Sequence, residues 1–162
     1  MKVGVILIVS LALSACSTFN PIPEGYMGPT AVIKDSFSEK SASNAHYFEL
    51  EKVNENRISD SFGATRQKYY GQGMYFEPVM VEHEVLPERQ SFTISGFVFY
   101  PTDAQLLFSN ALSVEGVVTF TPKAGETYTV SGTVNDDVSE VWLQDSSGNV
   151  IGDKFSKMHG KQ

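Results

Sequence analysis

Acid–base chemistry in this chain of 162 residues would depend on three histidines and a few carboxylates. The histidines are His46, His83 and His159, and no two of them show the HxH or HxxxH spacing of a metal site. His83 lies between Glu82 and Glu84 in a predicted strand, where we expect its ring to face solvent. His159 belongs to a C-terminal tail that we expect to be solvated. The sequence therefore predicts no metal site and no cofactor.

Two acidic pairs, Glu82 with Glu84 and Asp136 with Asp137, are the candidates for a small hydrolase or a ligand-binding enzyme. Such a site needs two convergent carboxylates whose pKa values are held apart. Asp136 and Asp137 also follow Asn135 in a predicted hairpin turn, where these side chains commonly bond the backbone. Neither the G-x-S-x-G nor the S-x-x-K motif of nucleophilic serines occurs. The sequence favours a protein that is not an enzyme, and the small hydrolase is the alternative.

The stretch YYGQGMYF, residues 69–76, holds Tyr69, Tyr70, Tyr75 and Phe76 beside two glycines. Aromatic side chains beside glycines in a loop are common on surfaces that bind a ligand or a partner. They are more common still as the lid of a hydrophobic core. We therefore take these four residues as a candidate partner surface, with the core lid as the more frequent alternative.

The only cysteine, Cys16, follows the residues MKVGVILIVSLALSA. Lys2 supplies a positive charge, and the apolar run from Val3 to Leu13 is shorter than the about 20 residues of a transmembrane helix. A basic start, a short apolar run and small residues before a cut are the parts of a secretory signal peptide. We therefore predict a signal peptide at residues 1–15.

Leu13-Ser14-Ala15-Cys16 resembles the lipobox of bacterial lipoproteins, in which cleavage immediately precedes the cysteine. The resemblance implies that the Cys16 sulfur carries a diacylglyceryl group, that the new N-terminus is acylated, and that the acyl chains anchor the protein in a membrane. Ser17 follows the cysteine, whereas aspartate there typically retains Gram-negative lipoproteins in the inner membrane. The resemblance thus implies the outer membrane, at its periplasmic face. The alternative is an ordinary signal peptide that leaves a free thiol in an exported protein.

The formal net charge is −7 at pH 7, with 19 acidic residues against 12 basic ones. This balance argues against binding to nucleic acid, which selects basic surfaces. It also argues against attraction to anionic lipid, so we expect membrane attachment to depend on the acyl chains. With Cys16 modified, no cysteine is left for a disulfide, and burial must stabilise a domain that we expect to be monomeric.

The residues after the cysteine, STFNPIPEGYMGP, are rich in proline and glycine. This composition is typical of an extended tether, which would reach roughly 40 Å in polyproline form. The sequence thus predicts four parts: the signal peptide at 1–15, a lipidated N-terminus and tether at 16–29, a β-sandwich domain at 30–155, and a solvated tail at 156–162.

Period-two patterns separated by turn motifs run through the domain and predict an all-β fold, a single antiparallel β-sandwich. One or two short helical turns interrupt it: Ser59–Tyr70 fits a short helix, and Asp103–Leu112 fits a helix or a strand. The predicted strands are Thr30–Asp35, His46–Val53, Met74–Leu86, Gln90–Tyr100, Gly116–Pro122, Glu126–Val134, Ser139–Gln144 and Asn149–Phe155.

Alternation along the later strands predicts which side chains enter the core. Trp142 alternates with its neighbour Val141, so we expect its indole on the opposite side of the sheet or at an edge. The predicted core residues are Phe120, Tyr128, Val130, Val134 and Val141.

FTPKAGETYTVSGTV followed by VWLQDSSGNVIGDK resembles a pattern of small bacterial lipoproteins. The matching residues are Ala124, Gly125, Tyr128, Val130, Val141, Trp142, Asp145 and Gly148. The resemblance implies an Ig-like or transthyretin-like sandwich in the cell envelope, and no particular activity. We therefore expect a lipid-anchored, non-catalytic envelope protein that presents a β-sandwich to a protein or polymer in the periplasm. The alternative is a small periplasmic hydrolase or ligand-binding enzyme that uses the acidic residues.

Overall fold

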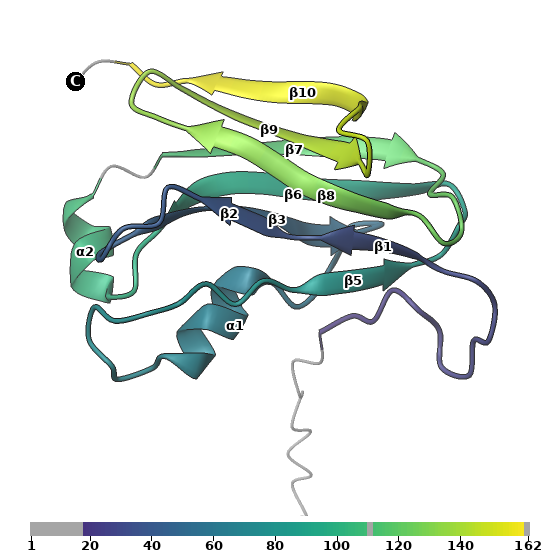
Figure 1. The fold of residues 1–162 in the computed structure, drawn as a ribbon, viewed down its shortest axis with the longest axis horizontal. Helices are drawn as coiled ribbons and strands as arrows, with labels where there is room; N and C mark the ends of the chain where they lie inside the picture. The colour runs from purple at the N-terminus through teal and green to yellow at the C-terminus, as the bar shows by residue number, and fades with distance from the viewer. Residues whose placement is uncertain (1–17, 110–111, 161–162) are drawn as a thin grey trace, which may run out of the picture.

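The computed structural model describes residues 18–109 and 112–160, so the predicted signal peptide and Cys16 lie outside the described residues. The described residues form two β-sheets and two short helices, as Figure 1 shows. Sheet A contains β1 (Ala31–Lys34), β5 (Glu82–Val85), β8 (Thr127–Val134), β9 (Val138–Asp145) and β10 (Val150–Met158). Sheet B contains β2 (Ser36–Ser38), β3 (Ala45–Val53), β4 (Asn56–Arg57), β6 (Gln90–Phe99) and β7 (Ser113–Phe120). The predicted all-β sandwich is confirmed.

The strand order is β10-β9-β8-β1-β5 in sheet A and β2-β3-β6-β7 in sheet B, where β4 also pairs with β3. One pairing departs from the predicted antiparallel arrangement: β1 runs parallel to β8, with Ile33 opposite Tyr128. Parallel neighbours need a long connection rather than a hairpin, and residues 35–126 lie between these two strands. Local turn motifs therefore gave no sign of this pairing.

The space between the sheets is filled by apolar side chains, which we call the inter-sheet core. Tyr128, Val130, Val134 and Val141 are buried there, and Phe120 packs against them, as predicted. The half-buried Trp142 alternates with Val141 and lies beneath the Lys154 ammonium, 4.0 Å from its ring centroid. The other buried members of the inter-sheet core are Ala31, Ile33, Phe48, Leu50, Val53, Ile58, Val85, Phe92, Ile94, Val114, Val118 and Leu143.

The hairpin turns of sheet A follow the predicted turn chemistry. Asn135 Oδ1 accepts hydrogen bonds from the N–H groups of Asp137 (3.0 Å) and Val138 (2.9 Å), which closes the turn from β8 to β9. Between β9 and β10, Asp145 Oδ1 accepts from the Asn149 N–H, and Gly148 adopts φ +83°. A positive φ at this position is the conformation that glycine tolerates without strain.

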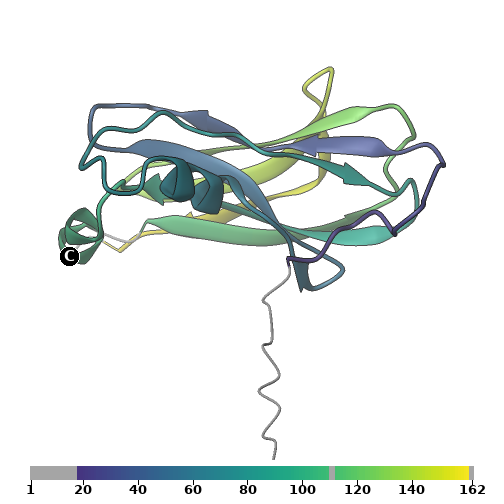
Figure 2. The ribbon, with the colours of Figure 1, turned by 90° about the horizontal axis from the view of Figure 1, so that it is seen from below.

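Helix α1 (Ser61–Lys68) confirms the predicted short helix and covers the outer face of sheet B. Asp60 caps its N-terminus, because the Asp60 carboxylate accepts from the Gly63 N–H at 2.7 Å. Figure 2, seen from below, shows α1 in front of the strands. The layer beneath it, which we call the α1 layer, contains Ala45, Tyr47, Phe62, Tyr69, Phe76, Met80, Phe97 and Phe99.

Helix α2 (Asp103–Phe108) forms the first part of the stretch 103–112, which the sequence left open between helix and strand; residues 110–111 lie outside the described residues. Thr102 caps it in a reciprocal arrangement with the Gln105 side chain, and β7 begins at Ser113. The helix leaves its apolar side chains in solvent: Leu106, Leu107 and Phe108 are all exposed.

The predicted strand Met74–Leu86 is wrong over most of its length, since only β5 is a strand. Its earlier residues cross over α1, and their N–H groups find partners on the helix instead of on a strand. The Val79 N–H donates to Thr65 Oγ1 at 3.0 Å, and the Val81 N–H donates to Ser61 Oγ at 2.9 Å. Side-chain hydroxyls thus replace the ladder that the pattern had predicted.

The boundary of the predicted solvated tail at 156–162 is also wrong, because β10 continues to Met158. Its last residues pair with the start of β9, with Met158 opposite Val138. Beyond the strand, the His159 N–H donates to the Asp137 carbonyl at 2.9 Å, and His159 Nε2 lies 2.7 Å from Ser139 Oγ. The side chains of residues 156–158 are exposed, so solvation was predicted correctly but the backbone order was not.

Candidate functional site

The segment 18–30 packs against the domain and is not the free tether that its composition predicted. The Phe19 N–H donates to the Arg57 carbonyl at 3.2 Å, and Pro21 and Ile22 are half-buried. The segment follows the side of the sandwich before it enters β1 at Ala31 (Figure 1). Proline and glycine set its backbone shape, but the bonds from Phe19 to Arg57 of β4 and from Thr30 to Glu84 of β5 tie its two ends to the domain.

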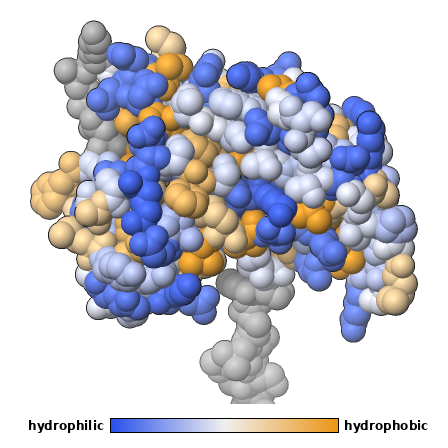
Figure 3. All heavy atoms as spheres, viewed as in Figure 1, coloured by the Kyte–Doolittle hydropathy of each residue, from blue (hydrophilic) through white to orange (hydrophobic). Residues whose placement is uncertain are grey.

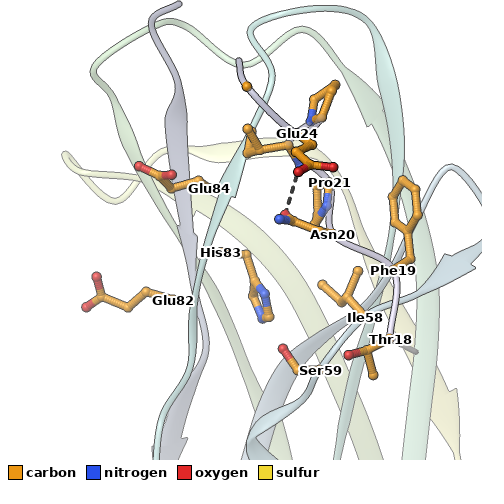
Figure 4. A pocket seen from close by; sticks show the side chains of 13 residues that line it. Thr18, Phe19, Asn20, Pro21, Glu24, Ile58, Ser59, Glu82, His83 and Glu84 are labelled. Atoms are coloured by element: carbon orange, nitrogen blue, oxygen red, sulfur yellow. Dashed lines mark hydrogen bonds between the residues drawn. The ribbon is translucent and has the colours of Figure 1, made fainter. Parts of the chain in front are cut away.

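Together with β5, this segment borders a groove of about 890 Å³. Ile58 and Ser59, which immediately precede α1, line its floor, and Figure 4 shows His83 pointing into it. Glu82 and Glu84 extend to the other side of the strand in this view. The groove therefore combines an imidazole, hydroxyls and apolar rings, with carboxylates at its rim.

His83 is 6% exposed, so the prediction of a solvent-facing ring is wrong. Its neighbours Glu82 and Glu84 are exposed, as the alternation of a strand requires, and His83 takes the inward position between them. His83 Nε2 has no hydrogen-bond partner among the described residues. It lies 3.9 Å from Asp35 Oδ2, within reach of an ion pair when the imidazole is protonated.

Asp35 is the centre of a buried polar cluster at the start of α1. Its Oδ1 accepts from the Leu50 N–H at 2.9 Å, and its Oδ2 accepts from Ser61 Oγ at 2.6 Å. Ser61 in turn accepts from the Val81 N–H. One carboxylate thus joins β3, α1 and the chain that leads into β5.

Glu49 is a second buried carboxylate, on the outer face of sheet B. Its Oε2 accepts from the Phe62 N–H at 3.0 Å, in the first turn of α1. Burial raises the pKa of Glu49 to about 9, and the negative charges of Asp60 and Asp35 act in the same direction. At neutral pH this carboxyl is therefore protonated and uncharged, which suits its position under the helix.

Ser61, Asp35 and His83 include the residue types of a nucleophilic triad but not its arrangement. In a triad the histidine stands between serine and aspartate and accepts the serine proton. Here the Asp35 carboxylate stands in the middle and accepts the hydrogen bond of the Ser61 hydroxyl, and Ser61 is fully buried. A substrate carbonyl has no approach to this hydroxyl, so the geometry supports a structural role in fixing α1.

The two acidic pairs proposed for a hydrolase do not converge. Glu82 is level with Lys34 in β1, and Lys34 is level with Thr129 in β8. Asp136 follows further along β8 in the turn to β9, which places it roughly 20 Å along the strand direction from Glu82 by strand rise. No site formed by both pairs results from this register.

The four aromatic residues of the candidate partner surface separate into two groups. Phe76 is buried in the α1 layer, where its ring packs against Phe99 at 5.0 Å, and Tyr69 is partly buried beside it. Tyr70 and Tyr75 are 87% and 61% exposed. The core-lid interpretation is thus right for Phe76 and Tyr69. Of the four residues, only Tyr70 and Tyr75 are exposed enough to contact a partner.

A second exposed apolar group, which the sequence did not single out, lies on α2. Leu107 is 81% exposed and Phe108 is 91% exposed. Figure 3 shows apolar residues at the end of the molecule where α2 lies. A short helix with a capping box, T-x-x-Q, followed by adjacent apolar residues is the signal that would have identified it.

The remaining histidines take no part in the groove. His46 lies on β3 opposite Val98, where burial lowers its pKa against the opposing effect of Glu39. In residues 18–109 and 112–160, no group of three or more His, Cys, Asp or Glu side chains is placed to hold a metal ion. Neither helix of the described part is long and apolar enough to cross a membrane.

Comparisons of the chain with models of protein families, with curated proteins and with solved structures found no match.

Proposed function

We propose that this chain is a lipid-anchored, non-catalytic protein of the bacterial envelope that presents its β-sandwich to a protein or polymer in the periplasm. The observation that carries the proposal is the position of Thr18, which Ser17 alone separates from Cys16. The backbone of the next residue, Phe19, already forms a hydrogen bond to the domain. Cleavage before Cys16 would therefore leave every described contact in place.

The use of the buried polar groups supports a role without catalysis. Asp35, Ser61 and Glu49 form hydrogen bonds with backbone N–H groups and, in the case of Asp35 and Ser61, with each other. These bonds hold α1 and the chain before β5 against sheet B. A site for acid–base chemistry needs such groups directed at a substrate within hydrogen-bond reach.

The finer description of the domain as Ig-like or transthyretin-like is part of this proposal. Its support is the pattern FTPKAGETYTVSGTV followed by VWLQDSSGNVIGDK, which falls on β8, β9 and the start of β10. The turn residues of that pattern, Asp145 and Gly148, make the hairpin contacts described above. Outer-membrane location and attachment through acyl chains on Cys16 follow from the lipobox and from Ser17.

Replacement of the lipobox cysteine tests the anchor. We expect Cys16→Ala to accumulate as the uncleaved precursor and to incorporate no radioactive palmitate, because sulfur is the group that becomes the thioether. Ser17→Ala is the matched control and should be labelled and cleaved as the unsubstituted chain is. Normal palmitate incorporation by Cys16→Ala would refute the lipid anchor.

The residue after the cysteine tests the location. Ser17→Asp should move the protein from outer-membrane to inner-membrane fractions of a density gradient, and Ser17→Ala should stay where the unsubstituted protein is. An unchanged distribution of Ser17→Asp would remove the basis for the outer membrane while leaving lipidation intact.

A further inference from the structure

The packed segment 18–30 determines how close the domain stands to a lipid on Cys16. Cys16 and Thr18 are two peptide steps apart, which span at most about 7 Å when fully extended. Thr18 lines the groove beside Ile58 and Ser59, immediately before α1. A lipid on Cys16 would therefore hold the start of α1 at the membrane surface, and not at the end of a long spacer.

The loop 69–76 lies one short helix away from this point. α1 runs from Ser61 to Lys68, about 12 Å at the rise of an α-helix, and the loop follows directly. Figure 1 shows the segment 18–30, α1 and this loop on the same, lower side of the molecule, which is the side turned to the viewer in Figure 2. We call this side the anchor face.

The exposed side chains of the loop are of the kind that favours a membrane interface. Tyr70 and Tyr75 combine an aromatic ring with a hydroxyl, and residues of this type gather at the level of lipid headgroups. Met74 between them is 59% exposed. Gly71 and Gly73 adopt positive φ, so the turn can present these side chains outward.

The positively charged side chain of Lys68 lies beside the loop 69–76. The Lys68 ammonium lies 5.5 Å from the Tyr69 ring centroid and pairs with no carboxylate in the described part of the chain. Long basic side chains beside an apolar surface can extend their charge to the headgroups while their methylenes stay buried. The chain as a whole carries −7, so the contact would depend on these few local groups and not on a general attraction to anionic lipid.

We propose that the loop 69–76 rests in the headgroup region of the bilayer that holds the acyl chains of Cys16, with Tyr70, Met74 and Tyr75 in contact with lipid. This inference rests on the proposed lipid anchor and names the lipid surface as the partner of the aromatic residues. The exposed apolar residues of α2 supply the contrast. The start of α2 borders the loop, because Thr102 and Asp103 line a pocket together with Tyr70 and Gly73. The helix itself lies at the level of the strands, above the anchor face (Figure 1), so we expect Leu107 and Phe108 to stay in water.

Tryptophan quenching by brominated lipid tests this arrangement. Trp142 is the only tryptophan, so a Trp142→Phe background lets one introduced indole report its own surroundings. Tyr70→Trp places the indole in the loop, and Leu107→Trp places it at a comparably exposed position on α2. Each full-length lipidated protein is purified from membranes and placed in phosphatidylcholine vesicles with or without brominated acyl chains.

We expect Tyr70→Trp to lose fluorescence in the brominated vesicles, at low and at high salt, and Leu107→Trp to keep its fluorescence. Equal quenching at both positions, or none at position 70, would overturn the inference. The mass of the N-terminal peptide of the same samples separates the two claims. An acylated Cys16 with no quenching at position 70 refutes only the lipid contact, whereas an unmodified Cys16 refutes the proposed function and this inference with it.

Hydroxyl-radical footprinting of the unsubstituted protein gives an independent readout, because it does not depend on a substituted protein that must fold. Met74 and Met158 are 59% and 77% exposed, and Met158 lies on β10, away from the anchor face. In vesicles, Met74 should be oxidised markedly more slowly than Met158. Similar oxidation of both methionines would contradict contact between the loop and lipid.

Discussion

The inter-sheet core and the α1 layer are both buried, but they are built from different side chains. Valine, isoleucine and leucine dominate the inter-sheet core, and its strands alternate inward and outward with period two. The α1 layer holds stacked aromatic rings, such as Tyr47 against Phe99 at 4.7 Å. Beside it lie the buried polar groups of Asp35, Glu49, Ser61 and Thr65.

This difference shows two ways in which the same chain supplies hydrogen-bond partners for its backbone N–H groups. In the inter-sheet core, the strands hydrogen-bond to each other, and the side chains contribute mainly apolar area. Under α1, side chains take over the bonding: Thr65 Oγ1 accepts from the Val79 N–H and pairs with the Tyr47 hydroxyl at 3.0 Å. Substitutions in the inter-sheet core should therefore destabilise the fold by leaving cavities, whereas substitutions under α1 should destabilise it by leaving buried polar groups without partners.

The largest expected effect is a cavity in the inter-sheet core. Tyr128→Ala should lower the free energy of unfolding by about 3–5 kcal/mol, because it removes a buried ring that packs on Phe120 and a hydroxyl that accepts from the Lys123 N–H. Thr133→Ala, exposed on the same strand, should change it by at most about 0.5 kcal/mol. Urea melts of the two variants give the comparison, and similar losses would show that the register of β8 is wrong.

Titration of Glu49 should make the α1 layer sensitive to pH. Burial raises the pKa of Glu49 to about 9, above its ordinary value of 4.5, so the folded state holds a proton that the unfolded chain releases. The stabilisation from protonated Glu49 is complete below pH 4.5 and is lost as the pH rises toward 9. Between these two pH values, the free energy of unfolding should fall by on the order of 1 kcal/mol per pH unit.

Glu49→Gln, which keeps the shape of the protonated acid, should flatten this fall. Glu115→Gln, exposed on β7, should leave the fall as it is in the unsubstituted protein. Urea midpoints measured from pH 5 to pH 9 report the slope. A slope that is unchanged in Glu49→Gln would show that Glu49 is ionised in the folded state.

Two buried serines test whether the hydrogen bonds of the polar groups beside the α1 layer stabilise the fold. Ser61→Ala should cost about 1–3 kcal/mol of unfolding free energy, since Asp35 loses a donor and the Val81 N–H loses its acceptor. Ser95 is equally a buried serine, but its hydroxyl has no partner among the described residues. Ser95→Ala should therefore be neutral or stabilising, and an equal loss in both variants would contradict the role given to Ser61.

The smallest expected effect concerns the exposed aromatic residues. Tyr70→Ala should change the free energy of unfolding by at most about 0.5 kcal/mol, because the side chain is 87% exposed. Phe76→Ala, within the same loop, should cost about 3–5 kcal/mol because its ring is buried in the α1 layer. Thermal or urea melts would contradict this assignment of Phe76 as buried and Tyr70 as exposed if Tyr70→Ala were the more destabilised variant.

The part of the inter-sheet core on β8 and β9 could be predicted from the sequence because these two strands are neighbours along the chain and pair through a hairpin. The turns at Asn135 and Gly148 have local chemistry that fixes the hairpins of sheet A, and the inward positions of Tyr128 and Val141 follow from period two. The pairing of β1 with β8 could not be predicted in this way, since no local motif joins residues so distant in sequence.

The α1 layer could be predicted only in part. The helix itself was expected, but Asp35 and Glu49 carry no signal of burial, because charged residues are exposed in most strands. His83 was misplaced for the same reason: its acidic neighbours suggested a polar strand, whereas alternation directs only those neighbours outward. The packed segment 18–30 was missed because proline and glycine indicate an irregular backbone without indicating whether it is free or bound.

The lipid anchor on Cys16 is the claim on which the function and the anchor face both depend. Mass spectrometry of the N-terminal peptide, from protein purified out of membranes, tests it most directly. We predict a peptide that begins at Cys16 and carries a diacylglyceryl group on sulfur and an acyl chain on the new N-terminus. A peptide that begins elsewhere, or an unmodified thiol at Cys16, would contradict the account.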